Sequence, residues 1–183
     1  MRTVTHSKLC SRSIKMKKPL QIRDIVLAAM LAALLIAAKE LLAWLPNVEL
    51  VTTLLILYTL HFPHLTPFII YIFVGVECCL YGLNLWVWMY LYIWIILYFI
   101  VRLLHSAGSR LLWVVVAAAF GMLFGLLCSP VYWVLSGWKT AAAWFMAGIP
   151  FDLLHGISNG IVTLVLFGPL NALFTRLKQK GYT

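Results

Sequence analysis

Residues 113–127 read WVVVAAAFGMLFGLL, and residues 50–60 read LVTTLLILYTL. Neither run alternates apolar with polar residues, as the strands of a membrane β-barrel do. In lipid the backbone must satisfy its own hydrogen bonds, which only helices and closed barrels achieve. The two runs therefore predict an all-α integral membrane protein.

The composition of the whole chain agrees with a lipid environment. Of its 183 residues, 64% are hydrophobic and 10% are charged, and the mean hydropathy is +1.00. Soluble domains have roughly 45–50% apolar and about 25% charged residues. Because a span needs about 20 residues, we expect a basic tail over residues 1–20 and one compact bundle of six transmembrane helices over residues 21–183. The expected spans are 24–44, 48–60, 67–81, 85–104, 111–135 and 143–173.

Basic residues are placed unevenly along this chain, whose net charge is +9. Seven of the 14 Lys and Arg residues precede the first expected span, and the expected inner segments hold 12 of them against two on the outer side. Lys and Arg mark the cytoplasmic side of membrane proteins. We therefore predict a multi-pass protein of the cell membrane with both termini in the cytoplasm. The basic residues would contact lipid headgroups, and no nucleic acid partner is expected.

Motifs for catalysis and metal binding are missing from the sequence. It has no GxxxxGK[ST], HExxH or GxSxG motif. The cysteines Cys10, Cys78, Cys79 and Cys128 form neither a CxxC pair nor a Cys/His spacing typical of zinc. We expect no catalytic residue, no metal and no cofactor of the chain's own. If transport costs ATP, a partner subunit is expected to hydrolyse it.

Charged residues occur within or beside the expected spans, where a charge is costly. In the predicted topology they all fall toward the outer end of the bundle, which indicates a polar pocket open to the outside. These residues are Lys39, Glu40, Glu49, Glu77 and Asp152.

The last expected span carries a polar stripe. Asp152, His155 and Asn159 are spaced i, i+3 and i+7 and so share one helix face. Gly148 and Pro150 are expected to interrupt the start of this segment and to free backbone groups for a ligand. Two interpretations remain open: the stripe faces a pocket, or an internal Asp–His pair joins two helices.

An aromatic run lies at the outer end of the fourth expected span. It comprises Trp86, Trp88, Tyr90, Tyr92 and Trp94. Such residues usually form a belt at the membrane surface. Because consecutive positions point all round a helix, one or two of these rings are expected to face inward and could stack on a flat ligand.

Small residues repeat along the first expected span. Their spacing lets another helix approach closely, and they cover more than one face, so one face could serve the fold and another a partner. They are Ala28, Ala29, Ala32, Ala33, Ala37 and Ala38.

These features resemble a known family. The size, the six expected spans, the basic inner tail and the AxxxA repeats are similar to the substrate-binding S component of an energy-coupling factor (ECF) vitamin transporter. The segments LPNVELVT (45–52) and GIPFDLLHG (148–156) are most similar to the cobalamin-specific subset.

The resemblance implies a function and partners. An S component captures a vitamin, here cobalamin, from outside, and docks on a transmembrane coupling subunit through its first span while two cytoplasmic ATPases drive the cycle. The AxxxA motif maps onto Ala28/Ala32 or Ala29/Ala33. The expected docking residues are Ala28, Ala29, Ala32, Ala33 and Ala37. The expected ligand-binding residues are Asn47, Glu49, Glu77, Asn84, Trp86, Tyr90, Asp152, His155 and Asn159.

Other functions remain as alternatives. The chain could be an S component for a different vitamin, an intramembrane enzyme that uses Asp152, His155 and Glu77, or a stand-alone permease. Product formation by the purified protein would favour the enzyme, and gradient-driven uptake by the chain alone would favour the permease. Stoichiometric vitamin binding without turnover would favour the S component.

Overall fold

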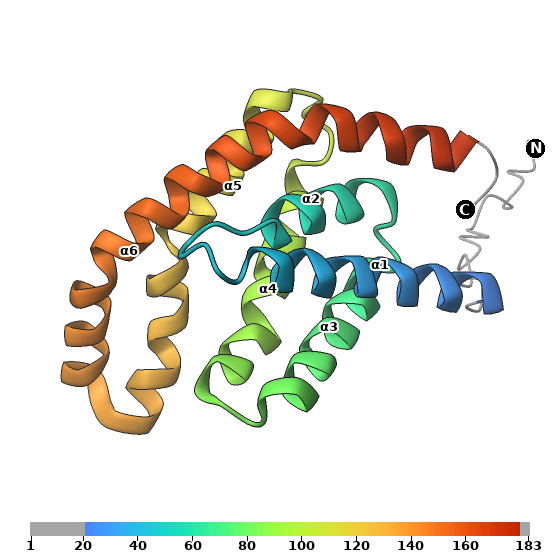
Figure 1. Cartoon of the computed structure of the whole chain (residues 1–183). Coiled ribbons are helices and arrows are strands. Elements are labelled where there is room, and N and C mark those ends of the chain that lie inside the picture. The colour runs from blue at the N-terminus through green and yellow to red at the C-terminus, as the bar shows by residue number, and fades with distance from the viewer. Residues whose placement is uncertain (1–20, 180–183) are drawn as a thin grey trace, which may run out of the picture.

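The computed structural model describes residues 21–179, and its secondary structure there is all helical (Figure 1). The predicted all-α class is therefore confirmed for the described residues, while the predicted tail over residues 1–20 lies outside them. The helices are α1 (Ile22–Leu42), α2 (Val51–His61), α3 (Thr66–Tyr81), α4 (Leu85–Leu104), α5 (Arg110–Met122) and α6 (Phe124–Gln179).

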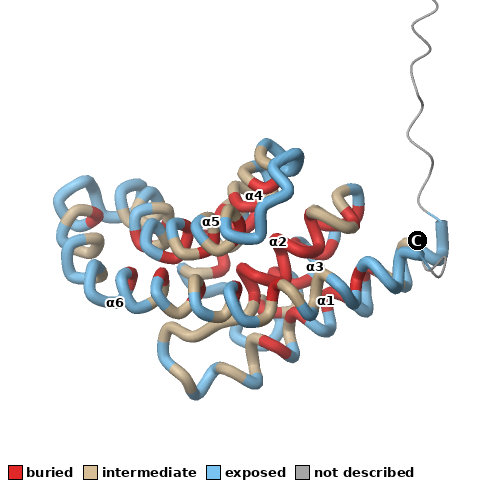
Figure 2. The backbone as a smooth tube through the Cα atoms, turned by 90° about the horizontal axis from the view of Figure 1, so that it is seen from above, coloured by how far each residue is buried: buried red, intermediate tan, exposed pale blue. Residues whose placement is uncertain are grey.

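Helix α2 lies at the centre of the molecule. Its positions 51–59 are all buried, and Figure 2 shows the buried positions gathered on α2 and on the parts of α1, α3 and α4 that surround it. The short length of α2 follows from this placement, because a helix shielded by its neighbours does not meet lipid along its whole length.

The long final segment differs from the two helices that the sequence predicted over residues 111–135 and 143–173. Helix α5 ends at Met122, and the chain continues through Leu123 into α6. Gly137 is the only residue inside α6 with a non-helical backbone, at φ 81° and ψ 168°. Glycine is favoured there because a side chain resists positive φ. We call residues 124–136 the first arm of α6 and residues 138–179 the second arm.

The expected interruption at Gly148 and Pro150 is wrong, because the helix runs through both residues. A proline removes one N–H from a helix and leaves a carbonyl group without its partner. At Pro130 this carbonyl belongs to Leu126, and the Ser129 hydroxyl donates to it at 2.8 Å. Membrane helices tolerate proline where such a local donor replaces the lost bond.

Helix α5 and the second arm of α6 cross at backbone contact. A Cβ atom added to Gly121 would lie 2.9 Å from the Cα atom of Gly156, and one added to Gly156 would lie 2.7 Å from the Ala118 carbonyl oxygen. Such close approach needs residues without side chains. The crossing fixes the second arm against α5 and so positions the polar stripe that this arm carries.

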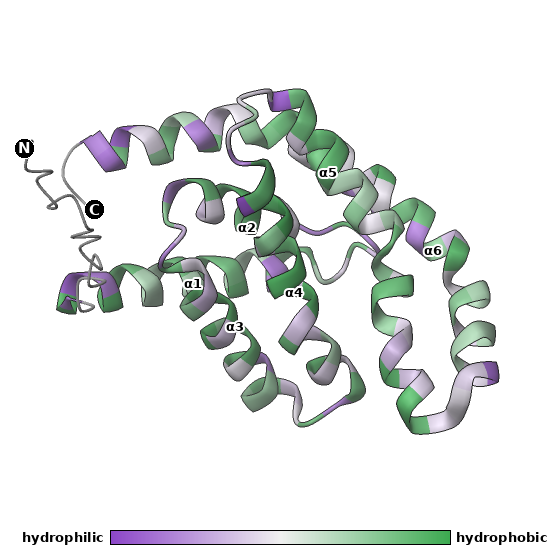
Figure 3. Ribbon diagram, turned by 180° about the vertical axis from the view of Figure 1, so that it is seen from behind, coloured by the Kyte–Doolittle hydropathy of each residue, from purple (hydrophilic) through white to green (hydrophobic). Residues whose placement is uncertain are grey.

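The lengths and apolar composition of the described helices fit a membrane protein. Three stretches are long and apolar enough to cross one, namely Ile22–Leu42, Leu85–Leu104 and the continuous segment Arg110–Gln179. Figure 3 shows hydrophobic residues along most of each helix and hydrophilic ones mainly toward the start of α1 and the end of α6. The start of α1 and the end of α6 lie on the same side of the bundle, away from the turn at Gly137 (Figure 1).

Helix α1 divides its alanines between two faces. Ala28 and Ala32 are 3% and 0% exposed within the chain, so in this conformation they face the bundle, and their docking on a partner stays a prediction. Their small side chains serve the packing of α1 inside the bundle. Ala29, Ala33 and Ala37 are exposed, and of the two AxxxA assignments only Ala29/Ala33 lies on an open surface.

Candidate functional site

A cavity of about 540 Å³ opens between the start of α4, the α1–α2 loop and the two arms of α6. We call it the main cavity. Six aromatic rings line its wall, and Asp152 and His155 supply charged or polar groups. Its lining residues are Asn47, Leu85, Trp86, Met89, Tyr90, Phe124, Gly125, Cys128, Tyr132, Trp144, Ala147, Gly148, Phe151, Asp152 and His155.

A second cavity of about 340 Å³ adjoins the first beneath the α1–α2 loop. We call it the side cavity. Asn47, Tyr90, Phe124 and His155 line both cavities, so the two are parts of one site. The remaining lining residues of the side cavity are Lys39, Leu42, Ala43, Leu45, Val48, Glu49, Val51 and Trp94.

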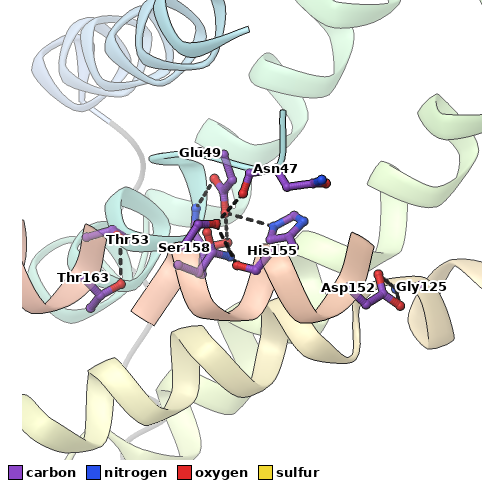
Figure 4. A network of polar contacts seen from close by, with 10 residues as sticks. Asn47, Glu49, Thr53, Gly125, Asp152, His155, Ser158 and Thr163 are labelled. Atoms are coloured by element: carbon purple, nitrogen blue, oxygen red, sulfur yellow. Dashed lines mark hydrogen bonds and ion pairs between the residues drawn. The ribbon is translucent and has the colours of Figure 1, made fainter. Parts of the chain in front are cut away.

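Asp152 joins the two arms of α6. Both oxygens of its carboxylate accept from the backbone N–H of Gly125 at 3.1 Å (Figure 4). Gly125 lies in the first turn of α6, where backbone N–H groups have no partner within the helix and a negative charge is favoured. Asp152 therefore connects two helical segments, as one interpretation proposed, but its partner is a backbone group and not His155. It also lines the main cavity, as the other interpretation expected.

Glu49 and His155 hold the α1–α2 loop against α6. His155 Nε2 lies 3.6 Å from Glu49 Oε1, too far for a hydrogen bond. The Thr52 backbone N–H donates to Glu49 Oε2 at 2.9 Å, and the Thr52 hydroxyl donates to Oε1.

Asn47 gives the α1–α2 loop its shape. It has a positive φ of 59°, which asparagine tolerates better than most residues. Its carbonyl oxygen accepts from the Ser158 hydroxyl on the second arm of α6 (Figure 4). Two contacts to α6, through Asn47 and Glu49, therefore hold this loop over the site.

Lys39 is the centre of an ion-pair cluster beside the site. Its ammonium group donates to Glu77 Oε2 at 2.5 Å and to Glu40 Oε1 at 3.1 Å. The Tyr81 hydroxyl donates to Glu40 Oε2 at 2.6 Å. The ammonium also lies 4.6 Å from the centre of the Tyr81 ring and 5.5 Å from that of Trp86, within the range of a cation–π contact.

Four buried polar atoms in and around the site lack hydrogen-bond partners. Trp94 Nε1, His155 Nε2, Glu77 Oε1 and Asn159 Oδ1 are buried and have no hydrogen bond. Such atoms are uncommon in folded proteins, because each costs free energy. Two of them, on Trp94 and His155, belong to residues that line the side cavity.

The predicted site residues fall into two groups. Those that line a cavity are Asn47, Glu49, Trp86, Tyr90, Asp152 and His155. The other three do not. Glu77 is fully buried against Lys39, Asn84 is exposed and donates to the Tyr81 carbonyl at 2.5 Å, and Asn159 is buried with its amide nitrogen 3.4 Å from the Thr52 hydroxyl oxygen.

Several lining residues were missed by the sequence reasoning. Lys39 was recognised as a costly charge but not assigned to the ligand site, and the aromatic wall of α6 was not noticed. Phe124 and Tyr132 are spaced eight residues apart on the first arm, and Trp144, Phe151 and His155 repeat at seven and four on the second. This helical spacing of large rings was the available signal.

The arrangement suits binding of an organic molecule. Within residues 21–179 no three His, Cys, Asp or Glu side chains are grouped so that they could hold a metal ion. A concave, mostly apolar wall with a few polar groups is typical of sites for small organic ligands.

Comparisons with known protein families, with curated proteins and with solved structures find no match to this chain.

Proposed function

We propose that this chain is the substrate-binding S component of an ECF-type vitamin importer. The observation that supports it best is the two-part cavity, because it lies within an otherwise apolar helical bundle and brings together six of the predicted ligand-binding residues. Rings and hydrogen-bonding groups of this kind suit a flat, polar vitamin. In this proposal the chain is not an enzyme, and partner subunits hydrolyse ATP.

The proposed topology has six spans in the cytoplasmic membrane. The segment from Arg110 to the turn at Gly137 would form the fifth span, and the second arm of α6 would form the sixth. Both termini would then lie in the cytoplasm, in agreement with the uneven distribution of Lys and Arg. The main cavity would open on the outer side, where the vitamin is captured.

The proposed ligand is cobalamin, because residues 45–52 and 148–156 resemble the cobalamin-specific subset of S components. A cavity of about 540 Å³ falls within the range of ~300–1,000 Å³ for drug-sized ligands. Cobalamin is larger than such ligands, so part of it would remain outside the cavity. Its flat macrocycle would lie against the aromatic wall, and its side-chain amides would meet the polar groups.

Assembly with the coupling subunit tests the proposed class of protein. Replacing both Ala29 and Ala33 with tryptophan should block docking, because the exposed small-residue face of α1 would no longer allow close helix approach. We expect the wild-type chain to co-purify with the coupling subunit and the two ATPases when all are produced together. The double variant should lose at least about nine-tenths of this partner yield, a difference of roughly 1.4 kcal/mol or more in association.

The matched control is Met30→Trp, which adds the same side chain at a neighbouring position that is 66% exposed. It should assemble normally. Normal assembly of the Ala29→Trp, Ala33→Trp variant would rule out this face, and failure of the wild-type chain to assemble would count against the S-component class.

A further inference from the structure

The charges around the site are strongly one-sided. Among the Lys and Arg residues of the described chain, only Lys39 lines either cavity, and the other basic group there is the His155 ring. Four of the five acidic residues in the sequence lie in or beside the two cavities, so carboxylates outnumber basic groups even when His155 is protonated. These residues are Glu40, Glu49, Glu77 and Asp152.

Both basic groups already lie beside carboxylates of the chain. The Lys39 ammonium contacts Glu77 at 2.5 Å and Glu40 at 3.1 Å. His155 Nε2 lies 3.6 Å from Glu49 Oε1. An anionic group on a ligand would have to compete with these carboxylates, and displacing one of them would leave a buried charge without its partner, which is costly. The site therefore disfavours an anion.

Asp152 places a negative charge at the wall of the main cavity. Both of its oxygens accept from the Gly125 backbone N–H, which is an uncharged donor in the first turn of α6 and favours the ionised carboxylate. Within residues 21–179 no Lys, Arg or His side chain forms an ion pair with Asp152. In a site of low dielectric constant, the field of such a charge acts over several Å and needs no direct contact with the guest.

The aromatic wall of the main cavity favours the same kind of guest. The face of an aromatic ring is negative and attracts a cation. The Tyr132 and Trp144 rings stack with their centroids 4.5 Å apart across the two arms of α6, and the Trp86 and Tyr90 rings lie 5.2 Å apart on α4. Several rings beside a carboxylate suit an organic cation better than a neutral group or an anion.

We propose that the main cavity selects its guest by charge: it takes a flat ring system that carries positive charge, and it rejects anions. This inference rests on the proposed vitamin-binding function and specifies which part of the vitamin enters. In cobalamin the macrocycle holds a trivalent cobalt ion and carries the positive charge, whereas the negative phosphate belongs to the nucleotide tail. The macrocycle would therefore enter the cavity, and the phosphate would stay outside.

A matched pair of ligands tests the charge selection on the full-length wild-type protein in detergent. Aquacobalamin differs from cyanocobalamin by water in place of cyanide on the cobalt, which adds one positive charge. Calorimetry at mildly acidic pH, where this water keeps its protons, should show at least about tenfold tighter binding of aquacobalamin. Equal or weaker binding would overturn the inference. So would tighter binding with a changed absorbance spectrum, because a protein group would then have replaced the water on the cobalt.

Removing the charge of Asp152 provides the second measurement. Asp152→Asn keeps a side-chain oxygen that can accept from the Gly125 N–H, and the melting temperature without ligand checks that the variant is folded. The preference for aquacobalamin over cyanocobalamin should then shrink to about threefold or less. A folded Asp152→Asn protein that keeps the full preference would show that this carboxylate does not select the guest.

Adding a positive charge to the cavity wall is independent of the contact between the two arms of α6. Ala147 is exposed and lines the main cavity. Ala147→Met is the matched variant for Ala147→Lys, because it adds a chain of similar length without charge. We expect lysine to weaken aquacobalamin binding at least about tenfold more than methionine does. Equal effects of the two substitutions would contradict the charge selection.

The outcomes with other vitamins separate the inference from the function on which it rests. Binding of thiamine, an organic cation, in place of cobalamin changes the ligand and supports both the charge selection and the S component. If neutral riboflavin, or anionic biotin or folate, binds more tightly than thiamine and both cobalamins, the charge selection is overturned and the S component stands. If no vitamin of this panel binds the wild-type protein, the proposed function fails and the charge selection fails with it.

Discussion

Replacing Lys39 with methionine should lower the free energy of unfolding by about 3–5 kcal/mol, the cost of breaking a buried ion pair by removing one partner. Glu77 is fully buried, and within residues 21–179 its carboxylate has one hydrogen-bond partner, the Lys39 ammonium. Without Lys39, this carboxylate remains inside the bundle with no counter-charge. Unfolding of the purified protein in detergent, followed by its melting temperature and by titration with denaturant, measures the loss.

Two controls accompany Lys39→Met: one also removes its partner Glu77, and the other makes the same Lys-to-Met change at an exposed position. Replacing Glu77 with leucine in the same chain should restore most of the stability, because it removes the uncompensated charge. Lys139→Met is the matched single change, since Lys139 is exposed near the turn at Gly137, and it should shift stability by no more than about 0.5 kcal/mol. A Lys39→Met variant as stable as wild type would show that the cluster does not hold α1 to α3.

Replacing Gly156 with leucine should prevent folding. A Cβ atom at this position would be 2.7 Å from the Ala118 carbonyl oxygen, and the Cα atom of Gly156 itself lies against Gly121. Backbone atoms cannot yield as a flexible side chain can, so the second arm of α6 would have to leave α5. Even Gly156→Ala should lower the free energy of unfolding by about 1–3 kcal/mol, because the added methyl group overpacks the helix crossing.

Gly75→Leu is the matched control for the helix crossing. Gly75 lies in α3, and an added Cβ atom there meets nothing within 4 Å. This variant should be at least as stable as wild type, because leucine favours a helix more than glycine by up to about 1 kcal/mol. Yield and monodispersity on size exclusion, compared at equal expression, measure both changes. A monodisperse Gly156→Leu protein at normal yield would contradict the crossing.

The helices could be predicted because lipid leaves the backbone few choices. Runs of apolar residues must be helical there, and the fourth predicted span, 85–104, coincides with α4. The ends of α6 were harder to predict. Pro150 was taken as an interruption, but the helix continues through it, while the reversal occurs at Gly137, where only the backbone angles show that glycine is needed.

The site could be predicted in part, because an intramembrane charge needs a purpose. That rule identified Glu49 and Asp152, but it could not identify their partners. Asp152 binds the Gly125 backbone 27 positions earlier, and Glu77 binds Lys39 at a separation of 38. These pairs depend on how the helices pack against one another, so no local sequence pattern could predict them. The same limit explains why Glu77 and Asn159 were expected at the cavity surface but are buried and line neither cavity.

The central claim is that this chain binds a vitamin stoichiometrically and does not transform it. Calorimetry of the purified protein with cyanocobalamin, riboflavin, thiamine, biotin and folate tests this directly, together with mass spectrometry of the recovered ligand. The account predicts saturable binding of one vitamin per chain, most tightly of cobalamin, with the ligand recovered unchanged. Tight binding of another vitamin would change the ligand and keep the class. Binding of none of them, even with the coupling subunit and both ATPases present, would contradict the account.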